Sequence, residues 1–207
     1  ELTPLLAGWQ GPEGWTDEAS REVQGYHAYI DKIAAPAETG PLTYAQVVGA
    51  IDRLATPTDY ALTAAGGFPG ELNNGWRAKG LDSFDAEYGF SCMGYEISGG
   101  WGAKMAMPDR EVIVFVGDGS YMMMNSDLYS SVLSGHKMIV LVCDNGGFAV
   151  INRLQVNQGG ASYNNLIADT NHANLVYVDF AAHAAAQGCL TETVTSVGEL
   201  EAAFERA

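Results

Sequence analysis

The chain has 207 residues, enough for one large domain with a sizeable core. Hydrophobic residues make up 47% and charged residues 17%, which is typical of a globular protein and excludes a disordered one. The formal net charge of −15 argues against nucleic acid or an anionic membrane surface as a partner. A phosphorylated ligand would therefore need a metal ion or backbone N–H groups to hold it.

The cysteines and the apolar runs of the sequence indicate the kind of compartment in which the protein works. The three cysteines are widely spaced and form no CxxC pair, which argues against zinc and disulfides and favours a cytoplasmic protein. No apolar run reaches the roughly 18 residues that a membrane-spanning helix needs. The chain starts without Met and stops inside a helical pattern, so we expect it to be a piece of a longer protein.

The first 40 residues differ from the rest. Only Asp17 to Ile33 has weak helical character, so residues 1–40 are interpreted as a linker or docking arm from a preceding domain. Residues 41–207 are predicted to form the main domain. It opens with Thr43 and Gln46 in the spacing of a capping box, followed by a helix to about Leu54.

The next predicted elements are a strand at 60–64, a turn at 66–70, an irregular stretch to residue 84 and a helix at 92–107. That helix contains Gly94, Gly99, Gly100 and Gly102, and each glycine costs about 1 kcal/mol relative to alanine in a helix. Something is therefore expected to pack close to this backbone.

The centre of the chain predicts a βαβ unit. Residues 111–116 and 138–143 are two apolar runs typical of buried strands, and a helix from near Tyr121 to Gly135 connects them. A polar loop (152–174), a helix (180–187), a strand (190–194) and a capped helix from Ser196 follow. The predicted fold is α/β, a three-layer doubly wound parallel sheet with helices on both faces.

Polar residues follow both central strands, where ligands bind in open α/β sheets. Asp118 lies between Gly117 and Gly119, and Asn145 precedes Gly146 and Gly147. A carboxylate, an amide oxygen and a free backbone carbonyl are hard oxygen ligands of the kind that Mg²⁺ prefers. The sequence therefore predicts a diphosphate bridged by Mg²⁺, facing the N-terminus of the next helix.

Two other kinds of phosphate-binding loop have glycine patterns similar to this one. A P-loop is excluded because no lysine follows Gly119. A Rossmann fingerprint lacks its third glycine, since Met122 stands there, although Asp144 could serve as the ribose-binding acid. A non-catalytic Rossmann-like nucleotide-binding module therefore stays open as an alternative.

The spacing of these residues resembles a known signature. Gly117-Asp118-Gly119, with an asparagine 27 positions after the acid, is similar to the thiamine diphosphate (ThDP) motif of the pyruvate oxidase and acetolactate synthase superfamily. The resemblance implies ThDP and Mg²⁺ as cofactors. It also implies that Asp118, Asn145 and the carbonyl of Gly147 are the metal ligands.

Segments 67–76, 119–127 and 143–155 further resemble the trihydroxycyclohexane-1,2-dione hydrolases of myo-inositol degradation. The implied activity is hydrolytic opening of the dione ring to 5-deoxy-glucuronate. An acetolactate-synthase-like carboligase or a 2-oxo-acid decarboxylase is the alternative. The resemblance also implies a homo-oligomer, dimer or tetramer, in which a pyrimidine-binding domain of another subunit supplies the activating glutamate. No catalytic residue is therefore assigned within this chain.

The same resemblance assigns further cofactor contacts. Met93 would be the apolar wedge that keeps the cofactor bent, and the carbonyl of Ser91 would accept from its amino group. The glycines from Gly94 to Gly102 would then pack against the cofactor. The diphosphate would be lined by a set of small or polar residues: Gly66, Gly67, Gly117, Asp118, Gly119, Ser120, Asn145 and Gly147.

Two polar segments are candidates for contacting the substrate. Residues 71–77, with Asn73, Asn74 and Arg77, could form a substrate-side loop or an ordinary polar turn. His172, in the loop after the second central strand, is a further candidate. The cysteines are expected to be buried small apolar residues.

Overall fold

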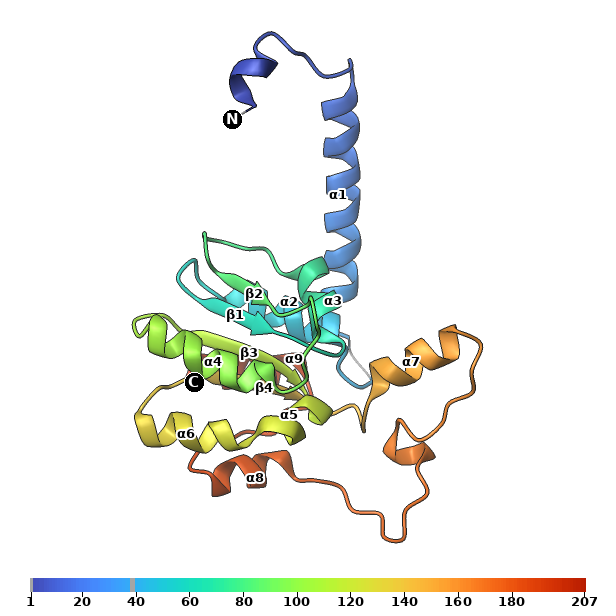
Figure 1. Ribbon diagram of the computed structural model, residues 1–207, viewed down its shortest axis with the longest axis vertical. Coiled ribbons are helices and arrows are strands. Elements are labelled where there is room, and N and C mark those ends of the chain that lie inside the picture. Colours follow the sequence, from blue (N-terminus) through green and yellow to red (C-terminus); the bar gives the residue numbers. More distant parts are fainter. Residues whose placement is uncertain (1, 38–39) are drawn as a thin grey trace.

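The computed structural model describes residues 2–37 and 40–207. A parallel four-stranded sheet with the order β2-β1-β3-β4 forms the centre of the domain, between two layers of helices (Figure 1). The α/β class and the three-layer architecture predicted from the sequence are confirmed. The strands are β1 (Tyr60–Thr63), β2 (Phe84–Ala86), β3 (Val112–Gly117) and β4 (Ile139–Cys143).

One face of the sheet is covered by α2 (Tyr44–Leu54), α3 (Phe68–Gly75) and α9 (Val197–Arg206). Ile51 and Phe68 from these helices pack with Phe115 of β3 in one core, and all three side chains are at most 1% exposed. The predicted capping box is present at α2: Thr43 Oγ1 accepts the N–H of Gln46, and the Gln46 side chain accepts the N–H of Thr43.

The other face is covered by α4 (Tyr95–Ala106), α5 (Asp118–Met124), α6 (Ser126–Ser134) and α8 (Phe180–Ala186). Ile97 and Tyr121 pack there against Val116 of β3. Burying both faces of β3 accounts for its continuous apolar sequence. The outlying elements are η1 (Thr3–Leu6), α7 (Ala149–Asn157) and η2 (Ile167–Asp169).

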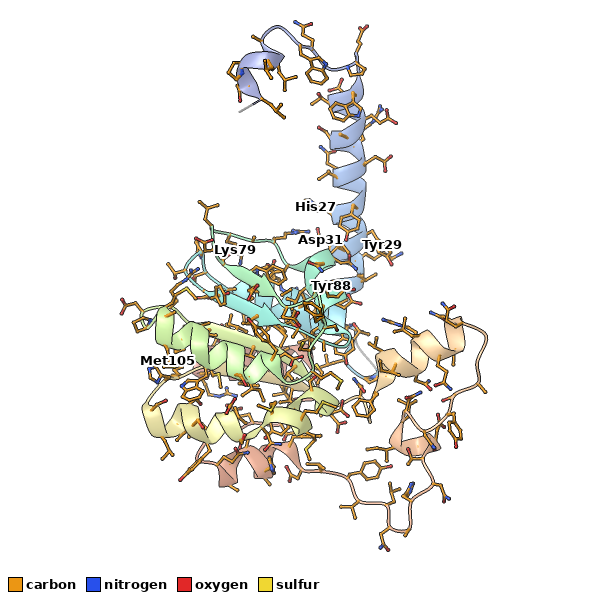
Figure 2. The ribbon with its side chains drawn as sticks, viewed as in Figure 1. His27, Tyr29, Asp31, Lys79, Tyr88 and Met105 are labelled. Atoms are coloured by element: carbon orange, nitrogen blue, oxygen red, sulfur yellow. The ribbon has the colours of Figure 1, made fainter. Side chains whose placement is uncertain are left out.

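Helix α1 (Trp15–Ala34) confirms the helical character of residues 17–33 and extends away from the domain along most of its length (Figure 1). Only its C-terminal half contacts α2 and α3, where Ile30 and Ala34 are buried. Asp31 and Tyr29 lie on this half (Figure 2). Asp31 Oδ1 accepts from Arg77 at 2.5 Å. Whether residues 1–40 dock a preceding domain stays a prediction.

Several predicted boundaries are wrong. The expected turn at 66–70 runs into α3, whose first turn contains Pro69, a residue with φ already suited to a helix start. The expected single helix up to Gly135 starts earlier, at Asp118, and is divided at Asn125 into α5 and α6. Strand β2 begins where the predicted irregular stretch ends, in residues for which no element was predicted, and helix α7 extends into the predicted polar loop.

The predicted strand at 190–194 is absent from the described sheet. These residues face β4 across a groove of about 1750 Å³ instead of pairing with it. Glu192, within this segment, forms an ion pair with Arg206 of α9. Strand β4 is consequently the sheet edge and is only half-buried, which corrects the prediction that both its faces are buried.

In the described residues no helix combines the length and the apolar character needed to cross a membrane.

Candidate functional site

The loops after β3 and β4 lie side by side, because Gly117 pairs with Cys143 at the ends of these two parallel strands. The pairing brings Asp118 next to the loop that contains Asn145 and Gly147. Asp118 Oδ2 accepts the backbone N–H of Gly147 at 2.7 Å. Asp118 and Gly147, two of the three predicted metal ligands, are therefore in direct contact.

Asp118 is buried, with 5% of the residue exposed. Burial raises its pKa, and the hydrogen bond from Gly147 partly opposes this effect. Its second oxygen, Oδ1, is buried without a hydrogen-bond partner among the described residues. A buried oxygen of this kind is costly unless something else binds it. It is a suitable position for a cation.

Asn145 is oriented by Tyr44. Its Nδ2 donates to the Tyr44 hydroxyl at 2.5 Å, which leaves the amide oxygen as the free end of the side chain. Desolvation is the main cause of the raised pKa of Tyr44, so this phenol stays protonated at neutral pH. Asp118, Asn145 and the carbonyl of Gly147 offer only hard oxygen donors, a set that fits Mg²⁺. In the described residues no group of three or more His, Cys, Asp and Glu side chains could hold a metal.

The loop after β4 is clamped by a distant segment. The N–H of Phe148 donates to the carbonyl of Asn165, and the N–H of Ile167 donates to the carbonyl of Gly146, both at 2.8 Å. Gly147 lies between these bonds with φ of +134°, and a Cβ there would be 2.5 Å from the Asn165 oxygen. The position therefore requires glycine.

Gly119 marks the point where two predicted parts of the site meet. A Cβ on Gly119 would lie 2.7 Å from the ring of Phe148 and 3.4 Å from Cε of Met93. Met93 therefore extends to the turn between β3 and α5. Ser120, also predicted in the site, is buried in the first turn of α5. A Cβ on Gly117 would meet no other atom within 4 Å.

The loop after β1 forms the third part of the site. Gly66 has φ of +85°, and a Cβ on Gly67 would lie 2.6 Å from the ring of Tyr44. Because Tyr44 also binds Asn145, the loops that follow β1 and β4 meet at this phenol. Tyr44 was not predicted as a site residue.

The carboxylate of Glu87 holds the loop that contains Ser91, which is exposed and has φ of +52°. Glu87 Oε1 accepts the N–H of Phe90 at 3.0 Å and its Oε2 accepts the N–H of Cys92 at 2.7 Å. These bonds lower the pKa of Glu87. Cys92 is exposed and Cys143 and Cys189 are only partly buried, which corrects the expectation that the three cysteines are buried.

The glycines of α4 pack against protein atoms, which corrects the prediction that they pack against a cofactor. A Cβ on Gly100 would lie 2.3 Å from Val114 of β3, and one on Gly94 would lie 2.4 Å from Met124. The expectation of close packing was right for Gly94 and Gly100, but their partners are Met124 of α5 and Val114 of the domain core. Gly102 has open space.

The two segments predicted to contact the substrate make their hydrogen bonds away from Asp118. Asn74 Oδ1 accepts from the Tyr26 hydroxyl at 3.0 Å, and Arg77 pairs with Asp31, so this segment docks α1. His172 is exposed, and its Nδ1 lies 2.7 Å from the carbonyl of Thr170 within the same loop. Among the described residues, no hydrogen bond or ion pair joins Asn74, Arg77 or His172 to Asp118.

Comparison with known families gives a match over residues 64–207 to the model described as "Thiamine pyrophosphate enzyme, C-terminal TPP binding domain". Thiamine pyrophosphate is another name for ThDP. The match includes the loops after β1, β3 and β4, that is, every residue predicted to bind cofactor or metal.

Curated relatives are named 3D-(3,5/4)-trihydroxycyclohexane-1,2-dione hydrolase. One from Bacillus thuringiensis (strain Al Hakam) is 36% identical over 216 residues, covering 93% of this chain and 33% of the relative. One from Bacillus cereus is 38% identical over 197 residues, covering 90% and 30%. One from Bacillus anthracis is 37% identical over 194 residues, covering 88% and 29%. The chain thus spans about a third of the length of these relatives. Since the family model matches more than half of the chain, the chain belongs to the thiamine pyrophosphate enzymes and contains their C-terminal TPP-binding domain.

Proposed function

We propose that this domain holds the diphosphate of ThDP through Mg²⁺, with Asp118, Asn145 and the carbonyl of Gly147 as the protein ligands. The observation that carries the proposal is the buried, unpartnered Oδ1 of Asp118 beside the Asn145–Gly147 loop. The cation would compensate the acidic charge of Asp118, so that an anionic diphosphate could bind in an acidic chain.

The remaining residues of the site would orient the cofactor. The backbone of Gly66, Gly67 and Ser120 would line the diphosphate, and Ser91 and Met93 would contact the aminopyrimidine ring. When bound, ThDP supplies the nucleophilic carbon and the electron sink needed to break a carbon–carbon bond beside a carbonyl. The role of this chain is to bind and position that group.

We further propose that the full-length protein hydrolyses trihydroxycyclohexane-1,2-dione to 5-deoxy-glucuronate in the cytoplasm, during inositol degradation. The names of the relatives support this substrate. The activating glutamate would come from a pyrimidine-binding domain of another subunit in a homo-oligomer. Tyr88 and Phe90 support such a partner, because they are 61% and 91% exposed on the loop that precedes Met93.

Two assays on the full-length protein test these proposals. ThDP binding measured by calorimetry should require Mg²⁺ and disappear with a chelator. Metal-independent binding would contradict the magnesium site, and binding of NAD in place of ThDP would favour the nucleotide-binding alternative. Supplying the dione and pyruvate separately should give ring opening of the dione. Release of carbon dioxide from pyruvate with the dione unopened would refute the hydrolase and leave the cofactor site intact.

A further inference from the structure

Glu96 is completely buried in the first turn of α4 and bonds to two separate loops of the site. Its Oε1 accepts the N–H of Ala65 at 3.0 Å, and its Oε2 accepts the N–H of Gly94 at 2.9 Å. Ala65 directly precedes the loop of Gly66 and Gly67. Gly94 directly follows Met93. One carboxyl group therefore joins the segment expected at the diphosphate to the segment expected at the aminopyrimidine ring.

Burying this carboxyl group costs free energy that an apolar side chain would avoid. Glu96 takes part in none of the ion pairs found in the described part of the chain. Its compensation comes from the two backbone N–H groups and from the N-terminal end of the α4 dipole. The contribution of Glu96 therefore comes from its two carboxylate oxygens, each of which accepts a backbone N–H.

The backbone at Gly94 is held in place, so it cannot shift to keep its bond if the side chain at position 96 changes. Its φ is +97°, and a Cβ there would lie 2.4 Å from Met124, so the loop is closely packed against α5. The neighbouring Met93 contacts the β3–α5 turn at Gly119. The Glu96 bond to Gly94 therefore fixes the start of α4 at the same place where Met93 enters the site.

We propose that Glu96 is a positioning residue that sets the separation between the Gly66–Gly67 loop and Met93, and thereby selects a ligand that contacts both. This inference rests on the proposed ThDP site and deepens it. A ligand with a ring and a diphosphate depends on that separation. Pyrophosphate alone occupies only the diphosphate end and does not depend on it.

The variant Glu96→Gln tests the proposal in the full-length protein. Glutamine keeps the size of the side chain but turns an NH₂ group toward one of the two backbone N–H donors, so one of the two bonds is lost. We expect the Kd for ThDP, measured with Mg²⁺ by calorimetry, to rise about ten-fold. The Kd for magnesium pyrophosphate should change by less than about three-fold.

Asp59→Asn is the matched control. Asp59 is a buried carboxylate at the opposite, amino end of β1, and its two oxygens accept the N–H and the hydroxyl of Thr56 at 2.7 and 2.9 Å. Its amide variant also loses one acceptor, but it should leave both Kd values unchanged. Glu96→Asp, which keeps the charge but is one methylene too short to span both loops, replaces Glu96→Gln if that variant does not fold.

The positioning role of Glu96 is tested by comparing the change in Kd for ThDP with the change in Kd for magnesium pyrophosphate. An equal loss for ThDP and pyrophosphate, or no loss for either, overturns the positioning role. So does an equal loss of ThDP affinity in Asp59→Asn. If the parent protein binds pyrophosphate but not ThDP, the proposed cofactor itself is wrong, which is a different failure from that of Glu96.

Discussion

Replacing Asp118 by asparagine should separate metal binding from stability. The neutral amide removes a buried, uncompensated negative charge, a relief of about 1–3 kcal/mol, although its NH₂ group stays without a partner at the Oδ1 position. It also weakens the bond from Gly147 by about 1 kcal/mol, because the acceptor loses its charge. The cofactor-free chain should therefore gain about 0–2 kcal/mol, which is roughly 0–6 °C in Tm for a domain of this size.

Binding should change in the opposite direction. The amide oxygen can still coordinate Mg²⁺, but without charge, so ThDP affinity should fall at least about 10- to 100-fold, by analogy with changes around metal ligands. Asp118→Ala should abolish binding. Its effect on stability should be small, within about 1–2 kcal/mol, because loss of the acceptor for the Gly147 N–H is offset by removal of the buried charge.

Thermal melting and calorimetry on the same samples decide between these outcomes. Because the pKa of Asp118 is raised in the folded chain, the folded state binds more protons than the unfolded state between the ordinary and the raised value. The parent should therefore gain stability as the pH falls through this range, and Asp118→Asn should not. Unchanged ThDP affinity in Asp118→Asn, or a Tm several degrees below that of the parent, would refute the reasoning.

Three further changes test neighbouring features. Gly147→Ala places a Cβ 2.5 Å from a carbonyl oxygen and should lower the free energy of unfolding by about 2 kcal/mol or more. Gly146→Ala strains the backbone but has open space, so it should lower the free energy of unfolding by only about 1 kcal/mol. Equal losses in Tm for the two variants would contradict the geometry described for the Gly147 loop. Tyr44→Phe removes the partner of the Asn145 amide and should weaken Mg²⁺-dependent ThDP binding several-fold in calorimetry, with the parent's affinity as the contrary result. The lowered pKa of Glu87 means that its bonds persist above the ordinary carboxyl pKa and are lost as the pH falls through the lowered value. Hydrogen-exchange protection at the two amides it binds should fall over that range, and constant protection would show that the loop does not depend on it.

The central βαβ unit and the adjacency of the two loops that follow its strands were predictable because their signals are local. Asp118 and Asn145 each end a strongly apolar run, and the connecting segment has helical spacing, so adjacency in the sheet follows from the topology. Helix α7 was missed because it has no side-chain cap and no buried residue. Strand β2 has only three residues, too few to show a period.

Other features depend on contacts between distant segments. Leu190 to Val194 has the composition of a strand, but strand formation requires a partner, and β4 does not pair with it. Glu96 bonds to Ala65 across 31 positions, so no local pattern identifies its role. An acidic residue in the first turn of α4 could at most have indicated a favourable helix-dipole interaction.

The two backbone bonds from Gly146 and Phe148 to the segment around Asn165 have a consequence for how this region tolerates change. They close the chain on itself directly beside the Asp118 contact, so the residues between them form a loop whose ends are fixed. The closure entropy of such a loop grows only logarithmically, by about 0.6 kcal/mol for each doubling of its length. Insertions or deletions near Gly159 can therefore reshape the surface beyond α7 at little energetic cost, while the geometry at Gly147 stays the same.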